Sequence, residues 1–249
     1  MASIFKAYDI RGIYGAELTP EKACDIGRAF VAFLGCKRVV VGRDMRPHSA
    51  PLFEGLARGL TMQGADVVDI GLCSTPMSYY ANGSLGADAS VMITASHNPG
   101  EWNGFKLCRA QAVPISGQTG IKDIERRVEA RDFPPPAAKP GTITAVDIGP
   151  AYATHVRGFF NLDGQARIAA DFANAMGIYE ARRILYSPVA RLCLTPVSTT
   201  RKQTGCGNKT GSALSDRKSQ NTREFARPKM LENWSNSPQR APVNSFSAA

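Results

Sequence analysis

Long apolar runs are missing from this sequence. No stretch approaches the roughly 18 consecutive apolar residues that a membrane-spanning helix needs, although 43% of the 249 residues are hydrophobic. Residues 1–6 also lack the apolar core of a secretory signal peptide. These absences argue against a membrane partner, and we expect a globular protein located in the cytoplasm.

Cysteine and histidine are too few and too scattered for a metal or disulfide scaffold. The six cysteines include no Cys-x-x-Cys pair, and the whole chain has three histidines. A structural zinc site requires closely grouped ligands, and disulfide-rich domains need many cysteines in a short chain. The sequence therefore predicts free thiols in a reducing compartment and no zinc centre.

The net charge of +9 is unevenly distributed along the chain. Residues 1–183 carry a net charge of +2, whereas residues 184–249 carry +7. A basic segment can bind nucleic acid or another polyanion, but no DNA- or RNA-binding motif accompanies this one. Nucleic acid is therefore a disfavoured partner, and a non-catalytic module with a polyanion-binding basic tail remains the alternative interpretation.

Apolar residues recur at helical spacing in two early segments. The first begins at Pro20, after the capping residue Thr19, and we expect Ser49 to cap the second. Short β-branched or apolar runs predict strands at 38–42, 66–71, 90–94 and 104–108. Alternating strands and helices are typical of βαβ units, so we predict an α/β fold whose mixed, mainly parallel sheet is sandwiched by helices.

The pattern of the sequence divides the chain into four parts. Residues 1–133 hold the α/β domain, and residues 134–145 form a Pro-rich linker. Residues 146–183 restart the pattern as an incomplete second α/β unit. Residues 184–249 are rich in polar residues and show no sustained period, so we predict a disordered basic tail that cannot bury enough apolar area to fold.

The strand at 90–94 runs directly into a polar turn. Asn98, Pro99 and Gly100 are strong turn residues, so Ser96 and His97 lie at the carboxyl end of the strand. Ligands of open α/β sheets bind at that edge. A serine hydrolase is disfavoured, because the sequence has no Gly-x-Ser-x-Gly elbow and a lone neighbouring histidine lacks the third group that orients a catalytic triad.

Four segments together carry a resemblance to a known family. Residues 5–12 read Phe-Lys-Ala-Tyr-Asp-Ile-Arg-Gly, and residues 41–46 read Val-Gly-Arg-Asp-Met-Arg. Residues 94–99 read Thr-Ala-Ser-His-Asn-Pro, and residues 103–106 read Asn-Gly-Phe-Lys. In this order and spacing they resemble the α-D-phosphohexomutase family, which includes phosphomannomutases and phosphoglucomutases.

This resemblance covers the chain well to about residue 130 and more loosely to about Arg183. It implies the fold of the family's first domain and the start of the second. It also implies an isomerase of the phosphotransferase type, which interconverts hexose 1-phosphate and hexose 6-phosphate, with mannose or glucose as the sugar. The reaction would proceed through a phosphoserine and a hexose 1,6-bisphosphate intermediate.

The resemblance also assigns roles to particular residues. Ser96 is the phosphoserine, and Lys106 is the general base or a charge-stabilising group. His97 donates a hydrogen bond to a phosphate or positions the substrate hydroxyl, with a backbone-bonded loop histidine as the open alternative. Tyr8 faces the sugar, and Arg11 faces the phosphoserine, since a guanidinium suits phosphate oxygens.

Neighbouring polar residues have plainer interpretations. We expect the side chain of Asn98 to hold its own turn. Arg43 and Arg46 flank Asp44 in the motif at residues 41–46, so a salt bridge within this loop is the simplest prediction for them.

Magnesium is the cofactor that the resemblance implies. Family members hold it with an Asp-rich loop together with an oxygen of the phosphoserine, and here only Ser96 supplies such a ligand. The sequence contains no Asp-x-Asp-x-Asp run, and one contact does not hold an ion that dehydrates so reluctantly. We therefore expect weak or no Mg²⁺ binding and an inactive or impaired fragment, truncated or frameshifted after about Arg183; the oligomeric state is not predicted.

Overall fold

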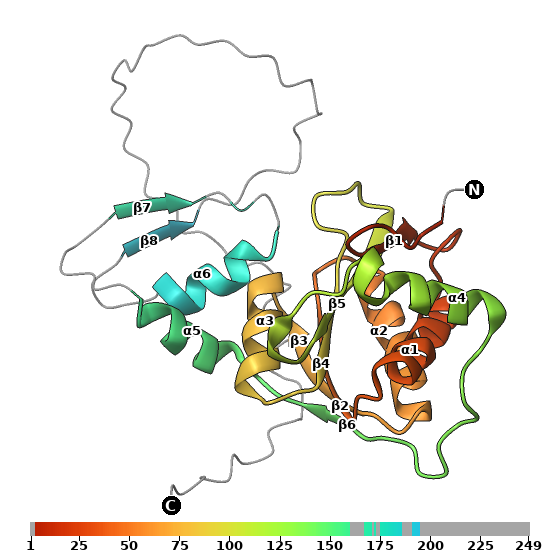
Figure 1. The fold of residues 1–249 in the computed structure, drawn as a ribbon. Helices are drawn as coiled ribbons and strands as arrows, with labels where there is room; N and C mark the ends of the chain where they lie inside the picture. Colours follow the sequence, from red (N-terminus) through yellow and green to blue (C-terminus); the bar gives the residue numbers. More distant parts are fainter. Residues whose placement is uncertain (1–2, 160–166, 171, 173–174, 186–190, 195–249) are drawn as a thin grey trace, which may run out of the picture. The chain divides into compact units, whose positions relative to one another are not determined.

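The computed structural model describes residues 3–159, 167–170, 172, 175–185 and 191–194 (Figure 1). A six-stranded sheet forms the centre of its first part, with the strand order β1-β5-β4-β2-β3-β6. The strands are β1 (Ile10–Ile13), β2 (Arg38–Arg43), β3 (Asp66–Leu72), β4 (Ala89–Ile93), β5 (Trp102–Arg109) and β6 (Ile143–Ala145). The helices around it are α1 (Pro20–Leu34), α2 (Ser49–Met62), α3 (Thr75–Ser84) and α4 (Lys122–Ala130).

The sheet is mixed and mainly parallel, which confirms the predicted fold class. Strands β2, β3, β4 and β6 are joined by parallel pairings. Strand β5 is the exception, because it runs antiparallel to both of its neighbours, β4 and β1. The chain therefore reverses directly after β4 instead of crossing over through a helix.

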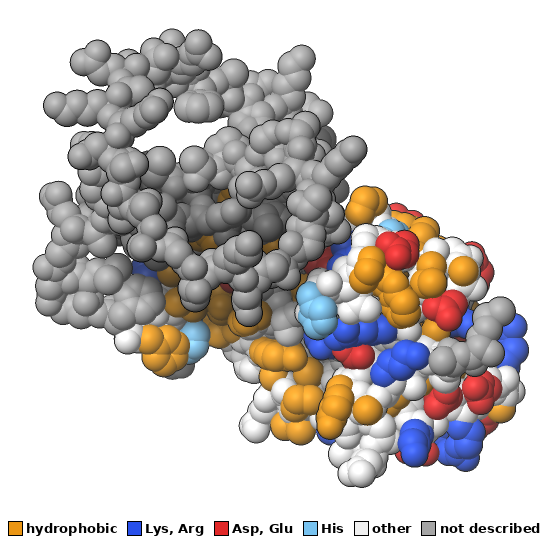
Figure 2. All heavy atoms as spheres, turned by 90° about the horizontal axis from the view of Figure 1, so that it is seen from above, with side chains coloured by type: hydrophobic (Ala, Val, Ile, Leu, Met, Phe, Trp, Pro, Cys, Tyr) orange, Lys and Arg blue, Asp and Glu red, His pale blue; other side chains and the backbone are white. Residues whose placement is uncertain are grey.

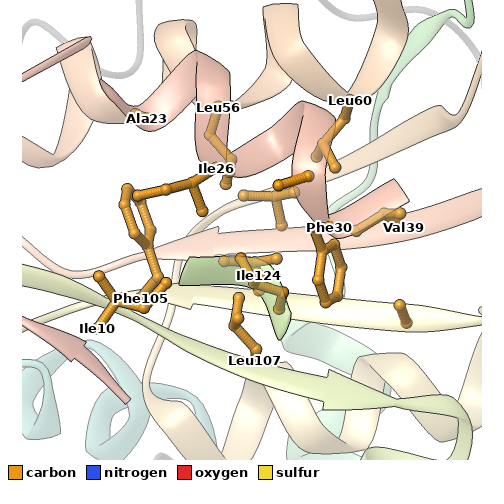
Figure 3. Packing of buried hydrophobic residues seen from close by; sticks show 14 of the residues in the cluster. Ile10, Ala23, Ile26, Phe30, Val39, Leu56, Leu60, Phe105, Leu107 and Ile124 are labelled. Atoms are coloured by element: carbon orange, nitrogen blue, oxygen red, sulfur yellow. The ribbon is translucent and has the colours of Figure 1, made fainter. Parts of the chain in front are cut away.

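Helices cover both faces of the sheet. Figure 1 shows α1, α2 and α4 on one face and α3 on the other. Successive residues of β2 point to opposite faces: Val39 and Val41 pack in the core under α1 and α2, whereas Val40 packs in the core under α3. Figure 3 shows the larger core, where Phe30 of α1 and Leu56 of α2 meet Phe105 and Leu107 of β5.

Two predicted helix caps have different outcomes. Thr19 caps α1 as expected, since its hydroxyl accepts a hydrogen bond from the Lys22 amide at 3.2 Å. The prediction that Ser49 caps α2 is wrong. Ser49 is the first helical residue, and its hydroxyl donates instead to Asp44 Oδ1 at 2.7 Å, so a stronger charged acceptor in the preceding loop takes the hydroxyl away from the helix end.

Two short strands of the six-stranded sheet were not expected from the sequence. Strand β1 has one apolar alternation only, which is too little for periodicity to detect. Strand β6 lies inside the segment predicted as the Pro-rich linker, 134–145, and its three residues are exposed. It pairs with β3 at the edge of the sheet, so backbone pairing rather than side-chain burial places it.

The second part of the chain contains α5 (Gly149–Arg157), β7 (Arg167–Ala170), α6 (Gly177–Leu185) and β8 (Arg191–Leu194). Strands β7 and β8 pair in parallel as a separate two-stranded sheet. The predicted end of the second unit at residue 183 falls inside α6, and β8 lies within the segment predicted as a disordered tail. The remainder of that predicted tail, residues 186–190 and 195–249, lies outside the described residues, as does most of the charge behind the polyanion-binding alternative.

Within the described residues, no helix combines the length and apolarity needed to cross a bilayer. Four cysteines have described side chains, and all of them are buried free thiols: Cys24, Cys36, Cys73 and Cys108. The expectation of unpaired thiols is thus confirmed for these four.

Glycines allow α1 and α2 to pack with their backbones nearly in contact. A Cβ atom added to Gly59 of α2 would lie 2.0 Å from the carbonyl oxygen of Cys24 in α1. One added to Gly55 would lie 2.1 Å from the carbonyl oxygen of Pro20. The rigid backbone atoms cannot give way at such distances, so these two positions require glycine.

We expect Gly59→Ala to lower the free energy of unfolding by about 2 kcal/mol, because the added methyl group must push α1 away from α2. Urea denaturation measures this loss. Gly83→Ala in α3 is the matched control, since a Cβ there meets nothing within 4 Å, and we expect it to be neutral or stabilising by up to about 1 kcal/mol. Equal changes in the free energy of unfolding for Gly59→Ala and Gly83→Ala would contradict the close contact between α1 and α2.

Candidate functional site

Ser96 lies on the connection between β4 and β5, in a loop that we define as residues 96–102 and call the Ser96 loop. Its backbone is left-handed, with φ of +56°, a conformation that costs a non-glycine residue about 1 kcal/mol or more. The amide of Ser96 donates to Thr94 Oγ1 at 2.9 Å. The residue is exposed, so the loop presents its hydroxyl to solvent at the end of a buried strand.

Asp9 contacts both Arg11 and Lys106, the two cationic residues predicted for the site. Its Oδ2 atom accepts hydrogen bonds from Arg11 Nε at 2.9 Å and from Lys106 Nζ at 3.1 Å, and it pairs with Arg11 Nη2 at 2.7 Å. Asp9 is 6% exposed. One nearly buried carboxylate therefore holds a guanidinium and an ammonium group side by side.

The pairing of β1 with β5 brings these three residues together. Arg11 lies opposite Gly104 in the antiparallel register, and a Cβ on Gly104 would lie 2.1 Å from the carbonyl oxygen of Ile10. The close approach of the two strands allows Asp9 to reach across to Lys106. Sequence reasoning gave Asp9 no role, because only this non-local pairing reveals it.

Arg11 also contacts the Ser96 loop directly. Its Nη1 atom donates to Asn98 Oδ1 at 2.8 Å. The prediction that the Asn98 side chain holds its own turn is therefore wrong, since a cationic donor from β1 is the stronger partner for the amide oxygen. The contact ties the paired cations to the segment that carries Ser96.

The other two predicted site residues are more exposed. His97 Nδ1 lies 3.3 Å from Ser96 Oγ, so the imidazole is within hydrogen-bonding distance of the hydroxyl. Tyr8 precedes Asp9 and is 79% exposed. Figure 2 shows basic side chains gathered beside a histidine on one exposed face of the described residues.

Arg46, on the loop between β2 and α2, contacts the Ser96 loop from another side. Its guanidinium donates to the carbonyl oxygens of Asn98 and Pro99, each at 2.7 Å, and of Trp102 at 2.9 Å. The expected pair with Asp44 is present, with 3.4 Å between Arg46 Nε and Oδ2.

Arg43 differs from Arg46 in its partners. It forms an ion pair with Asp69 at 2.7 Å, across the parallel pairing of β2 and β3, and its guanidinium lies over the ring of Phe53. The predicted pair with Asp44 is therefore wrong for Arg43, because a neighbouring strand offers it a nearer carboxylate.

A second contact from the β2–α2 loop defines a histidine tautomer. His48 Nε2 lies 2.9 Å from the carbonyl oxygen of Gly100, which can only accept, and Asn103 Nδ2 lies 2.9 Å from His48 Nδ1. Nε2 therefore carries the hydrogen in this arrangement, and Nδ1 accepts. Asn103 also donates to Ser49 Oγ at 2.9 Å, and the His48 ring stacks on Tyr14.

The described donor set does not fit a magnesium site by itself. Mg²⁺ needs several oxygen ligands in octahedral geometry, and the carboxylate that contacts Arg11 and Lys106, that of Asp9, is already shared between these cations. Among the residues that the structure describes, no three His, Cys, Asp or Glu side chains gather in a way that could hold a metal ion.

The described thiols do not offer a competing nucleophile. Burial raises the pKa of Cys36 and of Cys73 to about 12, and burial also raises the pKa of Cys108. Reaction requires the thiolate, which is scarce at neutral pH in such surroundings. Ser96, exposed and beside an imidazole, is the better placed nucleophile.

Comparisons with known proteins point to one family. Residues 2–135 match the family model described as phosphoglucomutase/phosphomannomutase, alpha/beta/alpha domain I. The chain is 46% identical to a phosphomannomutase from Escherichia coli over 163 residues, which are 65% of this chain and 36% of that protein. It is 49% identical to a phosphomannomutase from Klebsiella pneumoniae over 145 residues, 58% of this chain and 92% of that sequence.

A solved structure resembles the fold. The crystal structure of a phosphoglucomutase/phosphomannomutase family protein from Burkholderia thailandensis superposes with a TM-score of 0.71 at 32% identity. The superposition covers 78% of this chain and 44% of that one. The chain thus spans less than half the length of this protein and of its relative from E. coli.

Replacing Asp9 tests the shared carboxylate. We expect Asp9→Asn to lower the free energy of unfolding by about 2 kcal/mol, because it leaves two partly buried cations without their counter-charge. Urea denaturation at neutral pH measures this. Asp123→Asn is the control, because Asp123 pairs with Arg126 at an exposed position and should change stability by less than about 0.5 kcal/mol. If Asp9→Asn left the free energy of unfolding unchanged, the bridging role of Asp9 would be refuted.

Proposed function

Because the chain belongs to the phosphoglucomutase/phosphomannomutase family, we propose that it carries the phosphoserine site of a phosphohexomutase. Phosphorylated Ser96 gives its phosphoryl group to the free hydroxyl of a hexose phosphate and then takes back the phosphoryl group at the other position of the sugar. The observation that carries this proposal is the exposed Ser96 hydroxyl, held in a left-handed turn that Arg11 contacts through Asn98. Residues 1–133 are the domain that we assign to this site.

The transfer step exchanges one phosphate ester for another. The P–O bond to Ser96 Oγ forms as the P–O bond to the sugar oxygen breaks, and the serine proton ends on the sugar oxygen. His97 Nδ1, at 3.3 Å from Oγ, is placed to take that proton and pass it on. In the opposite step, the free hydroxyl of a hexose monophosphate attacks phosphorylated Ser96, so that its bond to phosphorus forms as the P–O bond to Oγ breaks, and its proton ends on Oγ. This step comes first in the overall reaction and produces hexose 1,6-bisphosphate, from which Ser96 then takes the phosphoryl group at the other position.

Arg11 and Lys106 balance the charge of the transferred group. Phosphoryl transfer depends on positioning and on neutralising charge at the phosphoryl oxygens. Lys106 Nζ donates a hydrogen bond to Asp9 at 3.1 Å, and an ammonium group donates hydrogen bonds but accepts none. We therefore propose the charge-stabilising role for Lys106, with the role of general base as the alternative.

Tyr8 and the substrate complete the proposal. The exposed ring of Tyr8 is free to contact a sugar face. We propose mannose or glucose phosphates as substrates, with the 1-phosphate and 6-phosphate interconverted overall. Buried free thiols at four positions suit the reducing cytoplasm as the site of this reaction.

This chain offers few ligands for Mg²⁺. When bound, Mg²⁺ would neutralise charge on the transferred phosphoryl group. An oxygen of phosphorylated Ser96 is the ligand that this chain would contribute, and the sequence has no Asp-rich run to supply others. We propose weak Mg²⁺ binding and slow turnover by this chain alone.

The carrier role is tested by phosphorylation of Ser96. We expect incubation with glucose 1,6-bisphosphate and Mg²⁺ to add one phosphoryl group per chain, which mass spectrometry of the intact protein and of its peptides would locate at Ser96. Ser96→Ala should abolish the modification, whereas Ser84→Ala at an exposed position on α3 should retain it. Modification of another residue, or none in the parent chain, would refute the carrier role.

Turnover is tested separately with glucose 1-phosphate and mannose 1-phosphate. A coupled assay for the 6-phosphate should find a rate at least about 100-fold below the median enzyme turnover of about 10 per second, because the chain lacks the aspartates that would hold the metal ion. Turnover near that median would contradict the proposal that this chain is impaired, while leaving the role of Ser96 to the phosphorylation experiment.

A further inference from the structure

The backbone carbonyls of the Ser96 loop converge on one side chain. Besides Asn98, Pro99 and Trp102, the guanidinium of Arg46 reaches the carbonyl oxygen of Ser96 at 3.1 Å and that of Gly100 at 3.4 Å. The contacts thus extend from the first residue of the loop to the last. The Arg46 side chain is 13% exposed, so the loop is packed over it.

We propose that Arg46 is a positioning residue that holds Ser96 in the geometry required for phosphoryl transfer. This inference rests on the proposed function of Ser96. Arg46 donates only to backbone oxygens of the loop, and its remaining partner is Asp44, so it acts through the loop and does not contact the transferred group.

The chemistry of the contact requires an arginine. A guanidinium has five N–H donors in a fixed plane, whereas an ammonium group has three donors around a single atom. The two Nη atoms of Arg46 divide the loop between them. Nη2 bonds the carbonyls of Ser96 and Asn98, on either side of His97, while Nη1 bonds those of Pro99, Gly100 and Trp102.

Asp44 fixes the third edge of the guanidinium. Its Oδ2 atom faces Arg46 Nε, while its Oδ1 atom accepts from Ser49 Oγ at 2.7 Å and from the Arg46 amide at 3.1 Å. Asp44 is itself buried. A buried carboxylate with partners on both oxygens thus sets the orientation of the donors that face the loop.

This support explains how Ser96 keeps an unfavourable backbone conformation. A left-handed serine persists only where the surroundings over-determine it. The bond from Arg46 Nη2 to the Ser96 carbonyl fixes the peptide that follows Ser96, and the bond to the Asn98 carbonyl fixes the peptide two residues further on. Without them, Ser96 is free to return to the right-handed region, which moves Oγ relative to the cations of β1 and β5.

The first experiment compares amide hydrogen exchange in three variants. The amides of Ser96, Asn98 and Trp102 are hydrogen-bonded within the loop region and serve as reporters. We expect Arg46→Lys to speed their exchange about tenfold or more, as expected for the loss of one charge-assisted hydrogen bond, with β2 unchanged. Asp44→Asn should also speed the exchange of these three amides, but by a smaller factor. Arg43→Lys is the matched control and should leave their exchange rates equal to those of the parent chain.

Two outcomes of this comparison overturn the proposal. Exchange of the three reporters at parental rates in both Arg46→Lys and Asp44→Asn would show that the loop keeps its conformation without Arg46. An equal increase in exchange rate throughout the sheet would show that Arg46 acts on global stability alone. Neither outcome depends on phosphoryl transfer, so this experiment tests the role of Arg46 even if the proposed function is wrong.

The second experiment measures the rate at which glucose 1,6-bisphosphate phosphorylates Ser96 in a single turnover. We expect Arg46→Lys to lower the maximal rate about tenfold or more and to leave the half-saturating concentration within about twofold, because Arg46 acts on loop geometry and not on the ligand. A raised half-saturating concentration with an unchanged maximal rate would instead make Arg46 a ligand-binding residue and overturn the proposal. Absence of phosphorylation in the parent chain would refute the function of Ser96, and the exchange experiment would then decide the role of Arg46.

Discussion

The site depends on the antiparallel insertion of β5 between β4 and β1. In a purely parallel sheet, the segment after β4 would leave through a helix, and its residues would separate from the strand end. Here the chain turns back at once, so the Ser96 loop is short and lies between two paired strands of the sheet. The same reversal lets β1 pair on the outer side of β5. Ser96, Arg11 and Lys106 thus share one region because of backbone hydrogen bonding, before any side-chain contact is considered.

Arg11 and Lys106 lie close together, and Asp9 offsets the repulsion between their positive charges. Two positive side chains held together without a ligand would repel each other. Asp9 lies between them, almost buried, and supplies the counter-charge. Under the proposed function, a phosphoryl group binds beside cations that are already oriented, so little reorganisation is required. The carboxylate that pairs with both cations would then also prepare the site for a second, exchangeable anion.

Local signals in the sequence predicted a large share of this structure. The cap at Thr19, the β-branched runs and the polar turn at Ser96 are set by residues close together in the chain, and each gave the element or loop that is observed. Three long-range contacts were not predictable in this way: Asp9 with Lys106, Asn98 with Arg11, and Arg46 with the carbonyls of the Ser96 loop. These partners lie about 50 to 100 residues apart in sequence, and the strand pairing that brings them together leaves no periodic pattern. The prediction for Ser49 failed for a different reason, because the nearby Asp44 competes for its hydroxyl.

Arg43 and Arg46 show why a motif alone does not assign roles. Both arginines belong to one short segment, and both form ion pairs with an aspartate. Arg43 is still in β2, so its side chain faces the neighbouring strand β3 and Asp69. Arg46 lies beyond the end of β2, where the chain has left the sheet and passes under the Ser96 loop. The loop is consequently held from two directions, by Arg11 from β1 through the Asn98 side chain and by Arg46 through the backbone. Because neither contact uses the Ser96 hydroxyl, that oxygen stays available while its backbone is fixed, which is what a phosphoryl carrier requires.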